Sequence, residues 1–263
     1  MAKFVEMFQN FIFDMDGVIY LQDSSIPGAK EVINYLKSAG KSILFLTNNS
    51  YYTPEYYVEK LSSMGIQASP ERILTSAAAT AMYLKKHHRL KGKTAFVIGG
   101  PGLEWEIKSI GLELLTTDSG RNAHFVIVGW DTNFNYEKMK VATLAINGGA
   151  IFIGTNYDKT FPSGEGLWPG GGAIIASIEV ATGKKAKIIG KPEKYMVEVA
   201  LALFDGKPQK TVLIGDRLDS DILAGKRAGI KTILVLTGVT SREMLEKSGI
   251  KPDYTLKGIW ELF

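Results

Sequence analysis

The sequence predicts an α/β protein with a doubly wound parallel sheet, into which a second α/β module is inserted. Short apolar segments alternate with segments of helical period, and this alternating order is typical of such sheets. The apolar segments are nearly continuous, as in parallel strands that are buried on both faces. At 263 residues, the chain is long enough to form one large domain or two modest ones.

The first strand is predicted at Phe11–Phe13, and two carboxylates follow it at Asp14 and Asp16. Positions i and i+2 of an extended chain point to the same side, and Gly17 then permits a sharp turn. Two carboxylates this close repel each other unless a cation or a proton lies between them. The pair is therefore a candidate metal and acid–base site, although a turn that caps the next segment is also compatible with it.

A helix and then a second strand and helix follow. Apolar residues recur with a helical period over 29–37, and Gly40 ends this predicted helix. A strand is predicted over 42–47, followed by the polar run Asn48-Asn49-Ser50, and a helix over 55–64. The order strand, helix, strand, helix implies parallel strands joined by helical crossovers.

Residues 77–186 repeat the helix–strand pattern without a second Asp-x-Asp, and we interpret them as an inserted α/β module. A loop rich in Gly and Pro is expected over 161–172. The other elements expected in this block are helices over 77–86, 103–109, 136–147 and 173–181, and strands over 94–98, 124–130 and 150–155.

The original pattern resumes after the insert, so the predicted core comprises residues 1–76 and 187–263. Gly190-Lys191-Pro192 leads into a predicted helix over 194–204. A strand over 211–215 ends in Asp216, and Asp221 follows five residues later. A helix to Ala228, a strand over 231–236 and a C-terminal helix complete the predicted core.

Several polar clusters thus fall where ligands bind in such sheets, at the carboxyl ends of the strands. Each has an alternative explanation: Thr47 and Asn48 could begin a helix, Gly-Lys-Pro could be a surface turn, and Asp216 and Asp219 could cap the next helix. The coincidence of these clusters at one edge of one predicted sheet favours a functional site.

Composition narrows the possible chemistry. The chain has no cysteine and three histidines, which excludes disulfides and thiol nucleophiles and disfavours a histidine-rich metal site. A metal must then rely on oxygen ligands, which suit magnesium or manganese. Gly40-Lys41-Ser42 and Gly92-Lys93-Thr94 imitate the end of a phosphate-binding loop but lack the glycine five residues earlier that this loop requires.

Charge and hydropathy constrain the partners and the location. The net charge is +4, and the basic runs 87–93 and 184–187 are not interleaved with aromatics, so no nucleic acid partner is expected. No apolar run approaches the roughly 18–20 residues that span a bilayer, so no membrane association is expected. The N-terminus lacks the pattern of a signal peptide, and we expect a cytoplasmic protein.

Four segments together resemble, in order, the motifs of the haloacid dehalogenase superfamily. They are Asp14-x-Asp16-Gly17, Leu46-Thr47-Asn48-Asn49, Gly190-Lys191-Pro192 and Gly215-Asp216-x4-Asp221. Leu-Thr-Asn-Asn and the long insert are similar to the para-nitrophenyl, phosphoglycolate and pyridoxal phosphate phosphatases of that superfamily. The resemblance implies a Rossmann-like core with a large α/β cap, magnesium-dependent hydrolysis of phosphate monoesters, and a homodimer formed through the cap.

The resemblance also implies roles for the acidic residues. Asp14 is the expected nucleophile, which attacks phosphorus to give an aspartyl-phosphate. Asp14, Asp216 and the backbone carbonyl of Asp16 are the expected Mg²⁺ ligands, because a cation must offset the repulsion between a carboxylate and a phosphate. Asp16 is the expected general acid and then base, and Asp221 is expected to orient Lys191 or a metal-bound water.

The remaining residues are expected to hold the substrate. By the same resemblance, Thr47, Asn48, Asn49 and Lys191 bind the phosphoryl group, with Thr47 and Lys191 counted among the catalytic residues. Thr155-Asn156-Tyr157-Asp158 resembles the Thr-Asn-x-Asp segment of caps in this subfamily. Asn156 and Asp158 are therefore expected to face the substrate, although a simple strand-ending turn explains the segment equally well. The glycine-rich loop 164–172 is expected beside them.

The sequence predicts a small phosphorylated metabolite as the substrate without specifying which one. A phosphotransferase that passes the phosphoryl group to an organic acceptor would use the same residues. A catalytically silent metabolite-binding protein is the alternative of another class, although two adjacent carboxylates beside a metal have no evident purpose in a pure binder.

Overall fold

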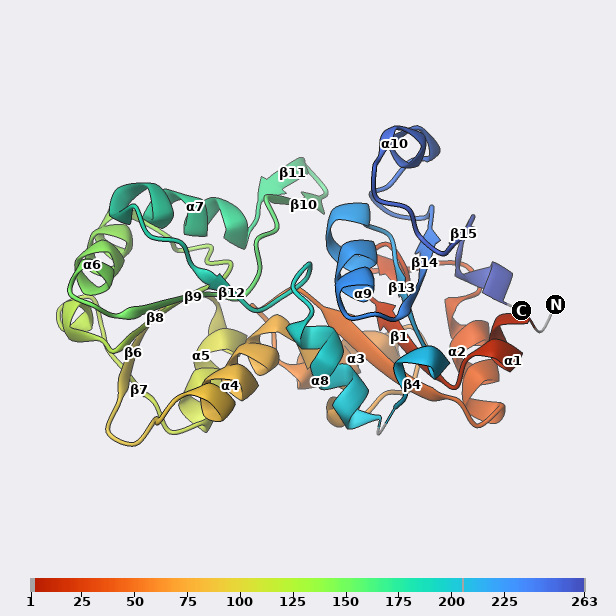
Figure 1. Cartoon of the computed structure of the whole chain (residues 1–263), viewed down its shortest axis with the longest axis horizontal. Helices are drawn as coiled ribbons and strands as arrows, with labels where there is room; N and C mark the ends of the chain where they lie inside the picture. The colour runs from red at the N-terminus through yellow and green to blue at the C-terminus, as the bar shows by residue number, and fades with distance from the viewer. Residues whose placement is uncertain (1–2, 205, 263) are drawn as a thin grey trace. The chain divides into compact units, whose positions relative to one another are not determined.

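The structure is a computed structural model that describes residues 3–204 and 206–262, and it divides into two compact units. The first unit comprises residues 3–47, 54–74 and 191–262, and the second comprises residues 48–53 and 75–190. In Figure 1 the first unit combines the two ends of the colour range, whereas the second is mainly yellow to teal. Among the described residues, no helix has both the length and the apolar character needed to cross a membrane.

The first unit is built on a six-stranded parallel sheet with helices around it, which confirms the predicted α/β class and doubly wound topology. In spatial order the strands are β15 (Tyr254–Leu256), β14 (Lys231–Val235), β13 (Thr211–Gly215), β1 (Asn10–Asp14), β4 (Ser42–Thr47) and β5 (Ile73–Thr75). The helices are α1 (Lys3–Met7), α2 (Ala29–Ser38), α3 (Pro54–Ser63), α8 (Tyr195–Leu203), α9 (Leu223–Arg227) and α10 (Arg242–Lys247).

The strand order explains why the site forms where it does. From β1 the chain winds outward to β4 and β5, and it later returns on the other side of β1 to build β13, β14 and β15. The order therefore reverses between β1 and β13, and ligands bind at such a switch point in open α/β sheets. The central strands β1 and β13 are fully buried, and their residues 11–13 and 212–214 are apolar, as their sequences predict.

The second unit has its own parallel sheet of five strands, of which the last in sequence lies just beyond the module predicted over 77–186. In spatial order these are β12 (Lys187–Ile188), β9 (Ile151–Gly154), β8 (Phe125–Val128), β6 (Thr94–Ile98) and β7 (Glu113–Leu114). The helices are α4 (Ser76–His87), α5 (Pro101–Ser109), α6 (Tyr136–Asn147) and α7 (Gly171–Thr182). Buried side chains from β6, β8, β9, α6 and α7 make up one apolar core.

Two hairpins and several short elements were not predicted. The segment 161–172, expected as a loop, contains the antiparallel pair β10 (Thr160–Ser163) and β11 (Gly166–Pro169), so that expectation was wrong. Gly166, in the left-handed region at φ +124°, begins the return strand of this pair. The other unpredicted hairpin joins β2 (Tyr20–Leu21) to β3 (Ser24–Ser25) directly after the Asp-x-Asp segment.

Candidate active site

Strand register brings the acidic residues of the first unit together. Phe13 of β1 pairs with Ile214 of β13, so Asp14 and Asp216 leave neighbouring strands at almost the same level. On the other side of β1, Asp14 pairs with Leu46, which places Thr47 one residue further along the same edge. These residues are distant in sequence, and they meet because parallel strands end at one edge of the sheet.

Three buried carboxylates form the centre of this site. Asp14, Asp216 and Asp221 each contribute one oxygen to a group in which all the oxygens lie within 4.8 Å of one another. Exposed fractions of 8%, 2% and 1% leave little room for water to screen their mutual repulsion. This arrangement is stable only if positive charge or protons offset it.

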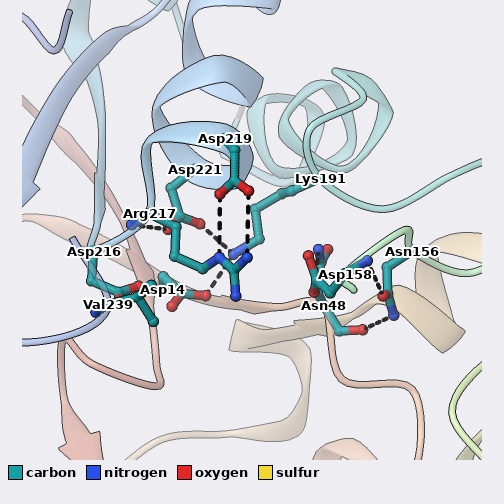
Figure 2. Close-up of polar contacts among 10 residues, drawn as sticks. All are labelled: Asp14, Asn48, Asn156, Asp158, Lys191, Asp216, Arg217, Asp219, Asp221 and Val239. Atoms are coloured by element: carbon teal, nitrogen blue, oxygen red, sulfur yellow. Dashed lines mark hydrogen bonds and ion pairs between the residues drawn. The ribbon is translucent and has the colours of Figure 1, made fainter. Parts of the chain in front are cut away.

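The Lys191 ammonium supplies part of that positive charge. Its Nζ lies 2.5 Å from Asp14 Oδ1 and 2.6 Å from Asp221 Oδ1, and its side chain is only 2% exposed (Figure 2). The alternative of a surface turn at Gly190-Lys191-Pro192 therefore does not describe this lysine. Three ionised carboxylates and one ammonium still leave an excess of two negative charges, which one divalent cation would neutralise.

The pKa shifts have the directions that this charge imbalance requires. Burial raises the pKa of Asp14 well above its ordinary value, Lys191 opposes the rise, and the charges of Asp221 and Asp216 add to it. Burial and the charge of Asp221 raise the pKa of Asp216 to about 7. Burial alone would lower the pKa of Lys191, but Asp14 and Asp221 outweigh it and raise that pKa, so the ammonium stays charged.

Backbone groups hold Asp216 in place. The Val239 N–H donates to Asp216 Oδ2 at 2.6 Å. A Cβ atom at Gly238 would lie 2.0 Å from that oxygen, and one at Gly17 would lie 2.6 Å from it. Gly17 also has φ +77°, a conformation that other residues rarely adopt. The two glycines therefore leave the space that the Asp216 carboxylate occupies.

A helical turn after β13 fixes Asp221. The π-helical turn η4 (Leu218–Ile222) directs Asp221 back to the strand end, and the Arg217 N–H donates to Asp221 Oδ2 at 3.0 Å. The alternative in which Asp216 and Asp219 cap the next helix is wrong, because Asp216 accepts from Val239 and the start of the turn has no side-chain cap. Asp219 instead pairs with the Arg217 side chain, 3.4 Å from its Nε (Figure 2).

Asp16 differs from the other carboxylates because it is exposed. Desolvation by the protein packed around its carboxyl raises its pKa, and the charges of Lys60 and Lys191 oppose this rise. Lys60 comes from α3, where its Nζ lies 4.4 Å from the centre of the Tyr20 ring. A carboxyl with a raised pKa and access to solvent can exchange protons at the mouth of a site.

Thr47 and Asn48 are adjacent in sequence but belong to different units. Thr47 is buried at the end of β4 in the first unit. In the second unit the Asn48 Nδ2 donates to Asp158 Oδ2 at 2.9 Å, and the Asn48 carbonyl accepts from Asn156 Nδ2 at 2.7 Å (Figure 2). The structure therefore joins Asn48, Asn156 and Asp158 in one network.

Asn49 and Asn156 also close turns. Asn49 Oδ1 accepts from the Tyr51 N–H at 2.8 Å, and Asn156 Oδ1 accepts from the Asp158 N–H at 3.1 Å. The strand-ending turn considered for residues 155–158 is thus present, and the same Asn156 side chain also reaches Asn48. A role of Asn49, Asn156 and Asp158 in binding substrate stays a prediction.

The chemistry of the buried donor set fits a hard divalent cation. Asp14, Asp216 and Asp221 offer oxygen ligands only, their charges exceed that of Lys191, and a cation of the magnesium type prefers such ligands. The ligands expected from the sequence were Asp14, Asp216 and the carbonyl of Asp16, whereas the buried side chains also bring Asp221 into the group.

Residues after β14 and on α3 were absent from the sequence-based site. Gly238 and Val239 lie in the run Thr237-Gly238-Val239-Thr240 after a predicted apolar strand. The rule that ligands bind at the carboxyl ends of parallel strands, which indicated Asp14 and Asp216, could therefore have indicated them as well. Lys60 had no such signal, because it lies in the interior of a helix like many solvated lysines.

Family models of known proteins match two parts of the chain. Residues 11–113 match the family model of haloacid dehalogenase-like hydrolases, and residues 188–262 match a second model of the same group. The chain is 38% identical to an acid sugar phosphatase of Staphylococcus haemolyticus, over 96% of this chain and 94% of that protein.

Solved structures of similar proteins cover nearly the whole chain. A hypothetical protein from Pyrococcus horikoshii OT3 is 48% identical, with a TM-score of 0.92 over 96% of this chain and 97% of that one. A 4-nitrophenylphosphatase from Thermotoga maritima is 37% identical, with a TM-score of 0.91 over 98% of this chain and 97% of that one.

Asp216→Asn tests the electrostatic cost of the site. Because the pKa of Asp216 is raised in the folded protein, its protonated carboxyl favours folding. In metal-free protein this contribution to the free energy of unfolding is complete below about pH 4, and it is lost as the pH rises through about 7. At pH 8 the metal-free variant should therefore exceed the original protein in unfolding free energy, by on the order of 4 kcal/mol. Thermal unfolding with and without Mg²⁺ measures the difference in stability, and only the original protein should gain stability from Mg²⁺.

A variant that is less stable than the original protein in metal-free buffer at pH 8 would contradict the repulsion assigned to the Asp216 carboxylate.

Gly238→Ala tests the space around Asp216. The added methyl group must displace the carboxylate, so Mg²⁺ affinity measured by calorimetry should fall by about tenfold or more. Gly249→Ala is the matched control, because a Cβ atom there meets nothing within 4 Å. Equal Mg²⁺ affinities of the two variants would show that the position of Asp216 does not govern metal binding.

Proposed function

Because the chain belongs to the haloacid dehalogenase-like hydrolases, within the p-nitrophenyl phosphatase group, we propose that this phosphatase hydrolyses small phosphate monoesters through an aspartyl-phosphate on Asp14. The observation that carries the proposal is the buried group of Asp14, Asp216 and Asp221 around Lys191. Its excess negative charge suits a Mg²⁺ ion, and its position at the switch point suits a phosphate.

In the first step, an Asp14 carboxylate oxygen forms a bond to phosphorus while the bond from phosphorus to the ester oxygen breaks. Asp16 gives its proton to the departing alkoxide, for which its raised pKa suits it. In the second step Asp16 takes a proton from water, which attacks the phosphoryl group and releases Asp14 and inorganic phosphate. A bound Mg²⁺ supplies positive charge that lowers the repulsion between the carboxylate and the phosphate.

Lys191 has two tasks in this scheme. Its ammonium holds Asp14 in one orientation, because Asp221 fixes it from the other side. It also provides a permanent positive charge for the phosphoryl oxygens, to which the Thr47 hydroxyl adds a hydrogen bond. Asp221 would therefore act through Lys191, which is one of the two roles that the resemblance implies for it; the other is to orient a metal-bound water.

We propose sugar phosphates as the first substrates to examine, since a relative with 38% identity is an acid sugar phosphatase. The second unit is the proposed cap, within which Asn156, Asp158 and the β10–β11 hairpin would recognise the leaving group. Phe161 and Trp168 pair across that hairpin with ring centres 6.1 Å apart, and aromatic rings of this kind can stack on a sugar. The homodimer and the cytoplasmic location expected from the sequence stay predictions.

Transfer to another acceptor is the competing reaction, since it requires the same residues. Inorganic phosphate release from a panel of sugar phosphates, measured with and without added alcohols, separates the two. Hydrolysis predicts one phosphate per leaving group at every alcohol concentration. A phosphorylated alcohol as the main product would favour the transferase, and inactivity on the whole panel with Mg²⁺ bound would favour a pure binding protein.

Asp14→Asn tests the nucleophile. The amide cannot form the acyl-phosphate, so hydrolysis of p-nitrophenyl phosphate should fall by about 10³-fold or more. The same activity should disappear when Mg²⁺ is removed from the original protein and return when it is added back. Circular dichroism checks that the variant is folded, and a folded variant with normal turnover would exclude this mechanism.

Asp16→Asn tests how the two carboxylates divide the reaction. Nitrophenolate is a good leaving group that needs little protonation, so the first step should still occur, whereas activation of water should fail. Rapid mixing should then show a burst of about one nitrophenolate per protein, followed by a slow phase, with a phosphoryl group retained on the protein by mass spectrometry. Equal slowing of both steps, without a burst, would contradict the role of Asp16 as base.

A further inference from the structure

The second unit contains a basic pocket of about 410 Å³ that the proposed reaction does not use. It is lined by residues near the starts of β8 and β9 and by the segment between α4 and β6, including His88, Arg89, Lys93 and His124. Arg89 and Lys93 belong to the basic run 87–93, for which the sequence predicts no nucleic acid partner. The pocket has the size of a small-molecule site.

The pocket lies at the opposite edge of its sheet from the network of Asn156 and Asp158. Ile151 lines it at the start of β9, whereas Thr155 follows the other end of that strand. At about 3.3 Å per residue, the two ends of β9 are roughly 10 Å apart. A ligand in the pocket is therefore separate from a ligand that contacts Asn156.

The lining carries positive charge without a compensating carboxylate. No Asp or Glu is among the described residues that line the pocket, and neither Arg89 nor Lys93 forms an ion pair within the described part of the chain. The end of α4 does not explain these charges, since Lys85, Lys86 and His87 in its last turn already complement the helix dipole. Arg89 and Lys93 lie beyond the helix and add charge to the pocket itself.

The two histidines are held in defined positions. The His88 ring packs edge-on against the Phe125 ring, with centres 5.3 Å apart. The Thr94 N–H donates to His124 Nδ1 at 3.2 Å, so the neutral His124 ring carries its proton on Nε2 and can donate from there. Asn122 adds an amide group to the same lining. Arginine, lysine, ring N–H and amide groups together are donors suited to phosphate oxygens.

We propose that this pocket is a second anion-binding site, which takes a small ligand bearing a di- or polyphosphate group. Arg89 and Lys93 provide the fixed charge, and His88, His124 and Asn122 provide oriented donors. The proposal does not depend on the phosphatase reaction, because all of these residues lie within the second unit and none is assigned to catalysis.

Histidine NMR signals give a selective test with inorganic pyrophosphate in metal-free buffer. The chain has three histidines, of which His88 and His124 line the pocket and His87 precedes His88. The carboxylate site belongs to the first unit, and none of the residues that line this pocket belongs to it. Saturable movement of the His88 and His124 ring signals, assigned with His88→Gln and His124→Gln, is the expected result.

Charge removal completes the test. Arg89→Ala combined with Lys93→Ala should weaken pyrophosphate binding by about tenfold or more, because each loses a charge-assisted hydrogen bond. Lys91→Ala is the matched control, since it removes the same charge from the same segment at a residue outside the lining, and it should change affinity less than twofold. The double variant should retain hydrolysis of p-nitrophenyl phosphate.

Two outcomes would overturn the proposal. One is the absence of saturable shifts of the His88 and His124 signals in the original protein. The other is equal weakening by the double variant and by Lys91→Ala, which would indicate only general attraction of anions to a basic surface. Loss of hydrolysis in Asp14→Asn with pyrophosphate binding intact would separate the two sites.

Discussion

The ion pairs of Lys191 with Asp14 and Asp221 are the interaction on which the active site depends. An isolated ammonium at 2% exposure would be very costly, and so would either carboxylate alone. Together they neutralise part of one another, and the lysine acquires a fixed position between the end of β1 and the turn η4. The other groups of the site must then accommodate the remaining excess of negative charge.

The neighbouring structure responds to that excess in a consistent way. Asp216 is held by a backbone N–H and lies between two glycines, so no side chain competes for the space next to its carboxylate. Because its pKa is raised to about 7, the ionisation of Asp216 in the absence of a cation lowers the stability of the folded protein. Such strain is typical of functional sites, in which stability is exchanged for a preorganised group of charges.

Much of this was predictable from sequence because it depends on local rules. Buried apolar strands and helical periods predicted the sheet, and the positions of Asp14, Thr47 and Asp216 at strand ends predicted the edge where they meet. The partners of these residues were not predictable in the same way. That Val239 rather than a helix end binds Asp216, and that Asn48 contacts Asp158, depends on how loops fold after the strands end. The β10–β11 hairpin was missed because its glycines and prolines suggested a loop.

The division of the chain at Thr47 and Asn48 has a practical consequence for protein engineering. A simple exchange of the second unit for that of a relative would join the two chains at two junctions, near Leu74 and Gly190. Residues 48–53 would then remain behind, although Asn48 is bonded to Ser76 and Asn156 of the unit being removed. A functional chimaera must therefore exchange this six-residue segment together with the insert, so that two separate segments of the chain, 48–53 and 75–190, are replaced.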